Sequence, residues 1–343
     1  MYDIFSKLNG AIDFFDSQTV NIINSDNSSF NQKASPYPFS QRQLLIDIDL
    51  ALNSIYKGGK FDPDGQRKLY LNIVRFYLNV SVKNTDVDTK NYVLSPADYG
   101  DTNMWSVWFL DRQYRAWLKE KGYAKTINEC VVDFNKYGGF VTKAVRDDII
   151  RVPLNSLKND QTAKTLLDGV RGGTPLIETH TYSYIEMCDY KDVWNVPEYF
   201  DGQRKVYDMY VYMKREELDE MKSRMSGDKK DIKEYKEGTK MDYATDEMVL
   251  TYSVLMPTGK DINDKAKKYS DTILFIEEID ELPYNECHNE KQDGRWLGVG
   301  EVEKQLENQI AKNLSANLRI TGMKNSATNV FLTIFLATWS PCV

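Results

Sequence analysis

The sequence predicts an α+β protein that is predominantly helical, with a small antiparallel β element and one long helix near its carboxyl end. In the first 140 residues, several segments carry apolar residues at helical spacing. Two β-prone segments, 248–256 and 271–279, flank a polar loop, which predicts an antiparallel pair. After Gly300 no glycine or proline occurs until Gly322, which leaves room for about five turns of helix.

Length, charge and cysteine usage narrow the class of protein. A chain of 343 residues is long enough for a substantial core and two subdomains. The formal net charge of -7 argues against a broad surface that grips nucleic acid tightly. The four cysteines form no CxxC pair, so we expect reduced intracellular thiols. No secretory signal and no run of about twenty apolar residues is found, so we expect a soluble protein without membrane partners.

Composition divides the chain into four predicted regions. The first is expected to be a flexible arm, because its second half is rich in Ser, Asn and Pro. A mainly helical region follows, then a mixed α/β region with a charged insertion at 214–240, and finally a glycine-rich turn with the long helix. The boundaries are 1–40, 41–170, 171–282 and 283–343.

Helices dominate the predicted elements of the first half. An amphipathic helix is predicted from Gln41 to the Gly58-Gly59 pair, and a second over residues 66–82. Segment 104–123 is predicted to be a helix whose tryptophans pack in the core, and a short helix is expected over 126–135. The β-prone segments 140–145 and 149–154 follow.

The polar stretch Asn84 to Lys90 resembles the start of a calcium-binding EF-hand loop. It lacks the glycine at the sixth position and the acid at the twelfth, where Thr89 and Ser95 stand. A polar turn is therefore the preferred interpretation.

Further along the chain, Thr174-Pro175 is expected to start a helix through residue 187, because proline suits a first helical turn. Segment 206–214 shows no decisive period and is compatible with a strand or a helix. The charged insertion at 214–240 is expected to be a solvated helix and loop, because its mixed charges nearly cancel and it has few apolar anchors.

The long helix carries an apolar residue at every fourth position. Because an α-helix repeats every 3.6 residues, this row winds by roughly 160° around the axis. Acidic residues near the start and basic residues near the end complement the helix dipole, and Gly322 is expected to cap the helix. The apolar row consists of Val302, Leu306, Ile310, Leu314 and Leu318.

No catalytic, cofactor or metal site is predicted. Cys188, Cys287 and the two histidines, His180 and His288, offer four soft ligands for zinc, but no pair has finger-like spacing. Cys287-His288 is likewise conceivable as a nucleophilic pair, without an accompanying glycine elbow. No phosphate-binding GxxxxGK[ST] loop is present, which disfavours a nucleotide-driven motor. Arg295 is expected to stabilise the turn before the long helix together with Trp296, through cation-π stacking or burial.

That turn and helix resemble the portal proteins of tailed bacteriophages, in the form found in crAss-like and other uncultured short-tailed phages. The family shows an R-W/F-L-G-x-G-x-x-E pattern before a helix containing Gln and Asn. The matching positions are Arg295, Trp296, Leu297, Gly298, Gly300 and Glu303, with Leu306, Ile310 and Leu314 on the helix behind them. Weaker likeness is found at 84–92, around Tyr137-Gly138 and in the LIETHTYSYIEM segment, so that it spans roughly residues 40–330.

The resemblance implies a portal wing and body in a ring of identical subunits, twelve in the family, at one capsid vertex. DNA is packaged and ejected through this ring, which is not an enzyme and needs no cofactor. The implied partners are other copies of the chain, the major capsid protein, the terminase, the tail adaptor and double-stranded DNA that passes without specific binding. The implied location is the virion, with host cytoplasm during assembly.

The sequence departs from the family after the matching helix, where portal proteins continue into a stem and a clip. Residues 330–339 form an apolar run close to the last residue, Val343, and we expect a chain truncated before the stem. Two alternatives remain open at this point. One is a phage hydrolase or nuclease that uses Cys287 and His288, and the other is a capsid or tail structural protein without a channel.

Overall fold

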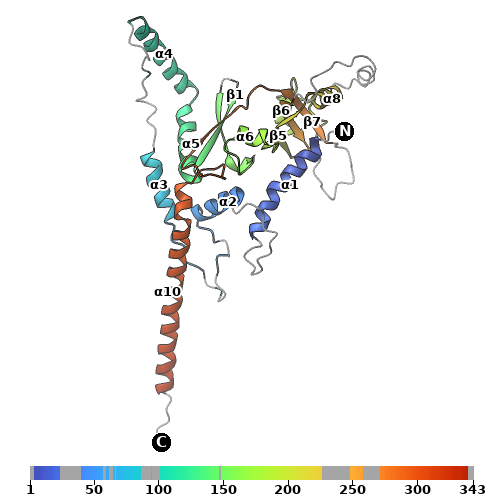
Figure 1. Ribbon diagram of the computed structural model, residues 1–343. Helices are drawn as coiled ribbons and strands as arrows, with labels where there is room; N and C mark the ends of the chain where they lie inside the picture. The colour runs from blue at the N-terminus through green and yellow to red at the C-terminus, as the bar shows by residue number, and fades with distance from the viewer. Residues whose placement is uncertain are drawn as a thin grey trace. The chain divides into compact units, whose positions relative to one another are not determined.

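The computed structural model describes residues 4–23, 40–56, 59–61, 65, 67–85, 94, 101–146, 148–225, 248–257 and 271–338 (Figure 1). The chain divides into two compact units, each built from two separate stretches. Unit 1 contains residues 1–42 and 140–298, and unit 2 contains residues 43–139 and 299–343.

A five-stranded antiparallel sheet forms the centre of unit 1, with the strand order β3-β4-β5-β6-β7. The central strand β5 pairs with β4 on one side and β6 on the other, so that Met209 lies opposite both Ile177 and Ser253. The strands are β3 (Leu157–Lys158), β4 (Leu176–Ser183), β5 (Gln203–Lys214), β6 (Met248–Met256) and β7 (Thr272–Glu278).

A second, three-stranded sheet has the order β2-β1-β8. Short helices connect the strands of unit 1, and two of them have a clear start signal. The Thr165 side chain caps α6, and Ser183 forms a capping box with Glu186 at the start of α7. These elements are β1 (Gly139–Val145), β2 (Asp148–Val152), β8 (Tyr284–His288), the 3-10 turn η2 (Leu154–Ser156), α6 (Leu166–Arg171) and α7 (Tyr184–Cys188).

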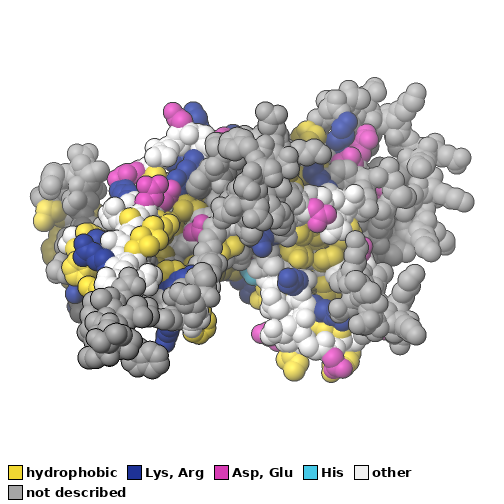
Figure 2. All heavy atoms as spheres, turned by 90° about the horizontal axis from the view of Figure 1, so that it is seen from below, with side chains coloured by type: hydrophobic (Ala, Val, Ile, Leu, Met, Phe, Trp, Pro, Cys, Tyr) yellow, Lys and Arg dark blue, Asp and Glu magenta, His cyan; other side chains and the backbone are white. Residues whose placement is uncertain are grey.

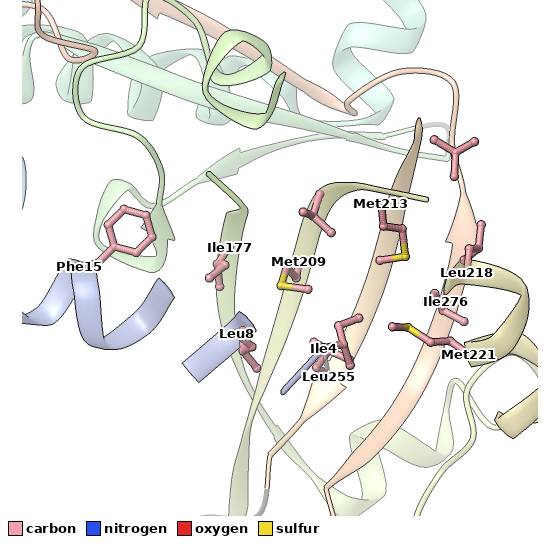
Figure 3. Packing of buried hydrophobic residues seen from close by; sticks show 12 residues of the cluster. Ile4, Leu8, Phe15, Ile177, Met209, Met213, Leu218, Met221, Leu255 and Ile276 are labelled. Atoms are coloured by element: carbon pink, nitrogen blue, oxygen red, sulfur yellow. The ribbon is translucent and has the colours of Figure 1, made fainter. Parts of the chain in front are cut away.

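The two faces of the five-stranded sheet have different neighbours, because successive side chains of a strand point to opposite sides. On one face, Met209, Val211 and Met213 of β5 pack with α1 (Ile4–Ile23) and α8 (Arg215–Met225) (Figure 3). The even-numbered residues of β5, including Asp208, face the other way. Val206, Asp208 and Tyr210 on that face are buried as well, so the middle of the central strand is buried on both sides.

Unit 2 is helical. It contains most of α2 (Gln41–Leu52), together with α3 (Val74–Asn84), α4 (Asp101–Glu120), α5 (Tyr123–Tyr137) and α10 (Glu301–Thr338). Asp49 of α2 accepts a hydrogen bond from the Tyr137 hydroxyl at 2.9 Å and pairs with Lys136 at 2.6 Å, which joins α2 to α5. None of the helices in the described part of the chain combines the length and apolar character that a membrane span requires.

The prediction of a predominantly helical chain with a small β element is wrong, because unit 1 is built on two sheets. The predicted pair over 248–256 and 271–279 is confirmed, but it forms only β6 and β7 of the larger sheet. The helix expected after Thr174-Pro175 is instead β4, followed by the short α7. Strands buried on both faces lack the polar alternation that identifies a half-buried strand.

Several helical predictions are confirmed with shifted ends. Helices occur at 41–52, 101–120 and 123–137, and β1 and β2 lie at the predicted β-prone segments. The second helix starts only at Val74, since residues 69–73 are not helical. Gly322 does not end the long helix, which runs to Thr338. Residues 4–23 form α1 within the range predicted as an arm, and residues 86–90 of the EF-hand-like stretch lie outside the described residues.

Candidate functional site

The Arg295–Gly298 turn is a buried structural element of unit 1. The Trp296 side chain is fully buried, and its Nε1 donates a hydrogen bond to Glu286 Oε2 at 2.6 Å. Its ring also meets the His288 ring edge to face, with the centroids 5.2 Å apart. Arg295 Nη2 donates to the Gly298 carbonyl at 3.0 Å, which closes the turn. These contacts hold the turn in place by burial and hydrogen bonds.

Gly300, which belongs to unit 2, lies against the end of α5. A Cβ atom added at Gly300 would lie 2.7 Å from both the Gly138 nitrogen and the Lys136 carbonyl oxygen. Both are backbone atoms and cannot swing away, so only glycine fits. The close contact fixes where α10 begins relative to α5, and Gly138 ends α5 in the left-handed conformation at φ 86°.

A row of amide side chains on α10 binds the segment that precedes α3. Gln309 Oε1 accepts hydrogen bonds from the Ile73 and Val74 nitrogens, at 2.8 and 3.2 Å. Asn313 Oδ1 accepts from the Leu71 nitrogen at 2.9 Å. Asn317 Oδ1 accepts from the Leu69 nitrogen at 2.8 Å, and its Nδ2 donates back to the Leu69 carbonyl at 3.0 Å. We call Gln309, Asn313 and Asn317 the amide row.

The amide row works because two repeats nearly coincide. Four residues of α-helix rise about 6 Å, and the N–H groups of Leu69, Leu71 and Ile73 follow one another at every second residue. The amides at every fourth residue of α10 therefore meet the backbone N–H groups at every second residue of 69–73. Gln309 also caps α3, whose N-cap residue Ile73 has no side-chain cap of its own. The four-residue spacing of these amides is present in the sequence, but the predicted packing of the helix rested on the apolar row alone.

The apolar row winds away from the buried side of α10. Val302 is fully buried and Leu306 is partly buried. Farther along, Ile310, Leu314 and Leu318 are 65%, 59% and 62% exposed. The amides take the buried face at this level instead, with Gln309 only 2% exposed. Figure 2 shows other hydrophobic side chains reaching the surface among charged ones. We call Ile310, Leu314 and Leu318 the exposed α10 row.

Helix α4 carries a second exposed apolar surface. Its residues are Met104, Trp105, Trp108 and Phe109, which are 58%, 75%, 53% and 56% exposed. We call these four residues the α4 patch. The prediction that Trp105 and Trp108 are core residues is wrong, because helix α4 turns them outward, and only Trp117 of the three is partly buried. Their helical spacing identified a common face but not the direction of that face.

A buried ionic cluster joins the two sheets of unit 1. Lys143 of β1 places its Nζ 2.8 Å from Glu178 Oε2 of β4 and 2.8 Å from Asp208 Oδ2 of β5. Tyr284 of β8 donates a hydrogen bond to Glu178 Oε2 at 2.6 Å. His180 Nε2 lies 3.5 Å from an oxygen of each carboxylate. No motif in the sequence indicates this cluster, since its members come from four strands.

Neighbouring charges hold the cluster in its ionised form. Burial alone would lower the pKa of Lys143, but the nearby Asp208 and Glu178 carboxylates outweigh it and raise that pKa. Burial raises the pKa of Glu178, yet hydrogen bonds from His180 and Lys143 bring it to about 2. Burial lowers the pKa of His180, whereas its hydrogen bonds to Asp208 and Glu178 raise it to about 9. At neutral pH Lys143 and His180 are therefore held in their protonated forms and Glu178 in its carboxylate form.

Glu178, His180 and Asp208 each offer one ligand atom, and these atoms lie within 4.8 Å of one another. Among the described residues this is the only group of three or more such side chains. The Lys143 ammonium, however, already lies between the two carboxylates, where a metal cation would have to bind. The chain's own lysine therefore supplies the positive charge that these acids need.

The proposed Cys287-His288 pair lacks the geometry for catalysis. Neighbouring residues of a strand point to opposite faces, and Cys287 is exposed whereas the His288 side chain is largely buried. His288 Nε2 lies 3.1 Å from Glu286 Oε2, and its Nδ1 is buried without a hydrogen-bond partner. His180 and Cys188 belong to other elements, so the described residues do not assemble the four zinc ligands.

No protein-family model matches the sequence, and no curated protein matches it significantly.

Proposed function

We propose that the chain is a structural subunit that binds copies of itself in a ring of the portal type, through which phage DNA passes at a capsid vertex. The observation that carries the proposal is the exposed α10 row of Ile310, Leu314 and Leu318. These three side chains are mostly exposed and follow one another along one side of the helix, so they form a continuous apolar strip. Such a continuous strip is typical of an interaction surface.

The position of the strip supports self-association over a role in the core of unit 2. The amide row occupies the buried face of α10 at the same level and satisfies the backbone of residues 69–74. Side chains spaced by four residues form a ridge that suits packing against another helix. The apolar residues are therefore left for a partner outside this fold unit.

The sequence pattern and the charge support a portal over other assemblies. Arg295, Trp296, Leu297, Gly298, Gly300 and Glu303 match the portal pattern, which supplies the expectation of a ring at a capsid vertex. A net charge of -7 suits a conduit, because DNA must slide through it without being held. In this proposal the protein is not an enzyme, and the ATPase that drives packaging is a separate protein.

The test is the assembly state of the purified chain. We expect oligomers in mass photometry and rings in negative-stain electron microscopy. Leu314→Glu should shift the population to monomers, because it places a charge in the middle of the exposed α10 row. Ser315→Glu is the matched control, since it adds the same charge at the neighbouring exposed position outside the row. A wild-type chain that stays monomeric at every concentration, or a Leu314→Glu variant that assembles normally, would contradict the proposal.

A further inference from the structure

A ring of identical subunits needs two different surfaces on each copy, one for each neighbour, and these surfaces must complement each other. The exposed α10 row supplies one surface in the proposed function. We propose that the α4 patch supplies the other, so that α4 of one copy packs on α10 of the next. This inference rests on the proposed function and adds which surface of the neighbouring copy is bound.

The size of the α4 patch fits such a role. With about 200 Å² for each large side chain, the exposed fractions of its four residues amount to roughly 500 Å². That area is at the upper end of the largest apolar patch on a typical monomer, about 300 to 600 Å². It is also more than half of the roughly 800 Å² that each partner buries in a standard interface.

The shapes of the two surfaces match as helix packing requires. On α4, Met104 and Trp108 form one row with a spacing of four residues, and Trp105 and Phe109 form a second row beside it. Two parallel rows leave a groove between them. The exposed α10 row is a single ridge with the same spacing, so it fits this groove. Large aromatic side chains on both sides of a groove are typical of interface anchors.

The charges beside the two surfaces are complementary when the helices run antiparallel. Arg112 follows the α4 patch, is exposed, and lies over the Trp108 ring at 5.2 Å. Glu307 precedes the exposed α10 row and is exposed as well. Glu307 lies about 10 Å along the helix from the centre of its apolar row, and Arg112 about 8 Å from the centre of the α4 patch. An antiparallel arrangement therefore brings Arg112 of one copy close to Glu307 of the next.

The pairing is expected between copies and not within one. Both helices belong to unit 2, and Figure 1 shows α4 extending from one end of that unit and α10 from the other. A contact between them therefore needs a second molecule. Repetition of the same contact from copy to copy gives a head-to-tail arrangement, which closes into a ring when the rotation allows it.

A charge-reversal cycle tests the pairing. We expect Arg112→Glu and Glu307→Arg each to weaken self-association about tenfold in sedimentation equilibrium, or about 1.4 kcal/mol. The double variant should recover most of the loss, because the pair is restored with its charges exchanged. Lys222→Glu, which changes the charge equally at an exposed site of α8, is the matched control and should associate like the wild type. Circular dichroism checks that each variant is folded.

A cross-linking experiment identifies the contact directly. The full chain with p-benzoylphenylalanine in place of Phe109 should give an intermolecular cross-link to residues 307–318 after irradiation. Cross-links to another part of the chain, or normal assembly of both single charge variants, would overturn the α4–α10 pairing. If Leu314→Glu still abolishes assembly in that case, self-association through α10 stands and only the partner surface is wrong. A monomeric wild type would overturn both.

Discussion

Lys143 Nζ lies 2.8 Å from Asp208 Oδ2, and this ion pair connects the three-stranded sheet to the five-stranded sheet within unit 1. Glu178 binds the same ammonium from the neighbouring strand β4. Removal of the lysine would leave two buried carboxylates facing each other with only His180 to compensate. A buried charge that loses its partner is strongly destabilising.

We therefore expect Lys143→Met to lower the free energy of unfolding of unit 1 by about 3 to 5 kcal/mol. Urea denaturation followed by tryptophan fluorescence measures this change. Lys205→Met is the control, because Lys205 is exposed on β5 and its loss should change stability by less than about 0.5 kcal/mol. Equal stability of the two variants would show that the cluster does not hold the sheets together.

The His180 side chain predicts how stability depends on pH. Its pKa is raised to about 9 in the folded protein from an ordinary value near 6.5, by its hydrogen bonds to Asp208 and Glu178 against the opposing effect of burial. The folded state therefore binds its proton more tightly than the unfolded state does. The stabilisation is complete below about pH 6.5 and is lost as the pH rises through 9.

We expect the melting temperature to fall between pH 6.5 and 9, and His180→Gln to remove most of that slope. The Glu178 carboxylate acts in the opposite direction at low pH. Its pKa of about 2 is depressed, so its contribution is present above about pH 4.5 and is lost as the pH falls through 2. Thermal melts of the wild type and of His180→Gln across the pH range measure these effects. An unchanged slope in His180→Gln would assign the alkaline loss to another group.

Two glycines of unit 2 predict opposite responses to alanine. Gly300→Ala should destabilise unit 2 by about 2 kcal/mol or more, because the added Cβ meets the backbone of α5 at 2.7 Å. Gly322→Ala should stabilise it by up to about 1 kcal/mol, because nothing lies within 4 Å of the new Cβ and alanine favours the helix. Thermal denaturation of the two variants compares their stabilities directly. The same sign for both would contradict the close packing at Gly300.

Replacement of a polar residue of the amide row is expected to lower stability strongly, although the sequence alone would place that residue on the surface. Gln309→Leu should cost about 1 to 3 kcal/mol, because it leaves the buried N–H of Val74 without its acceptor and leaves the Ile73 N–H with only the Leu71 carbonyl. Asn308→Leu is the control, since Asn308 is exposed on the neighbouring position of α10. Hydrogen exchange of the Ile73 and Val74 amides measures the loss locally. Unchanged protection in Gln309→Leu would exclude this role.

Periodicity predicted the helices of unit 2 well, because α2, α3, α5 and α10 each bury one face. It failed for unit 1, where the middle of β5 and the first residues of β4 are buried on both sides and show no polar alternation. It also failed at residues 69–73, whose apolar spacing suggested a helix. That segment is not helical, and the amide row of α10, more than two hundred residues later in the chain, binds its backbone.

The ionic cluster could not be predicted from the sequence for a related reason. Lys143, Glu178 and Asp208 are charged residues of three β-strands far apart in the sequence, and only the register of β4 against β5 brings the two acids side by side. The register places Glu178 directly opposite Asp208. The α4 patch was visible as an aromatic segment, but its outward direction depends on which side of α4 faces α5. Spacing alone does not determine that direction.

The repeat of amides on α10 has a mechanical consequence. Gln305 precedes the row at the same spacing, so a slide of the helix by one step would present Gln305, Gln309 and Asn313 to the same three backbone positions. The hydrogen bonds alone would therefore permit more than one position of this helix along its axis. The close contact of Gly300 with the backbone of α5 allows only one position of α10 along its axis.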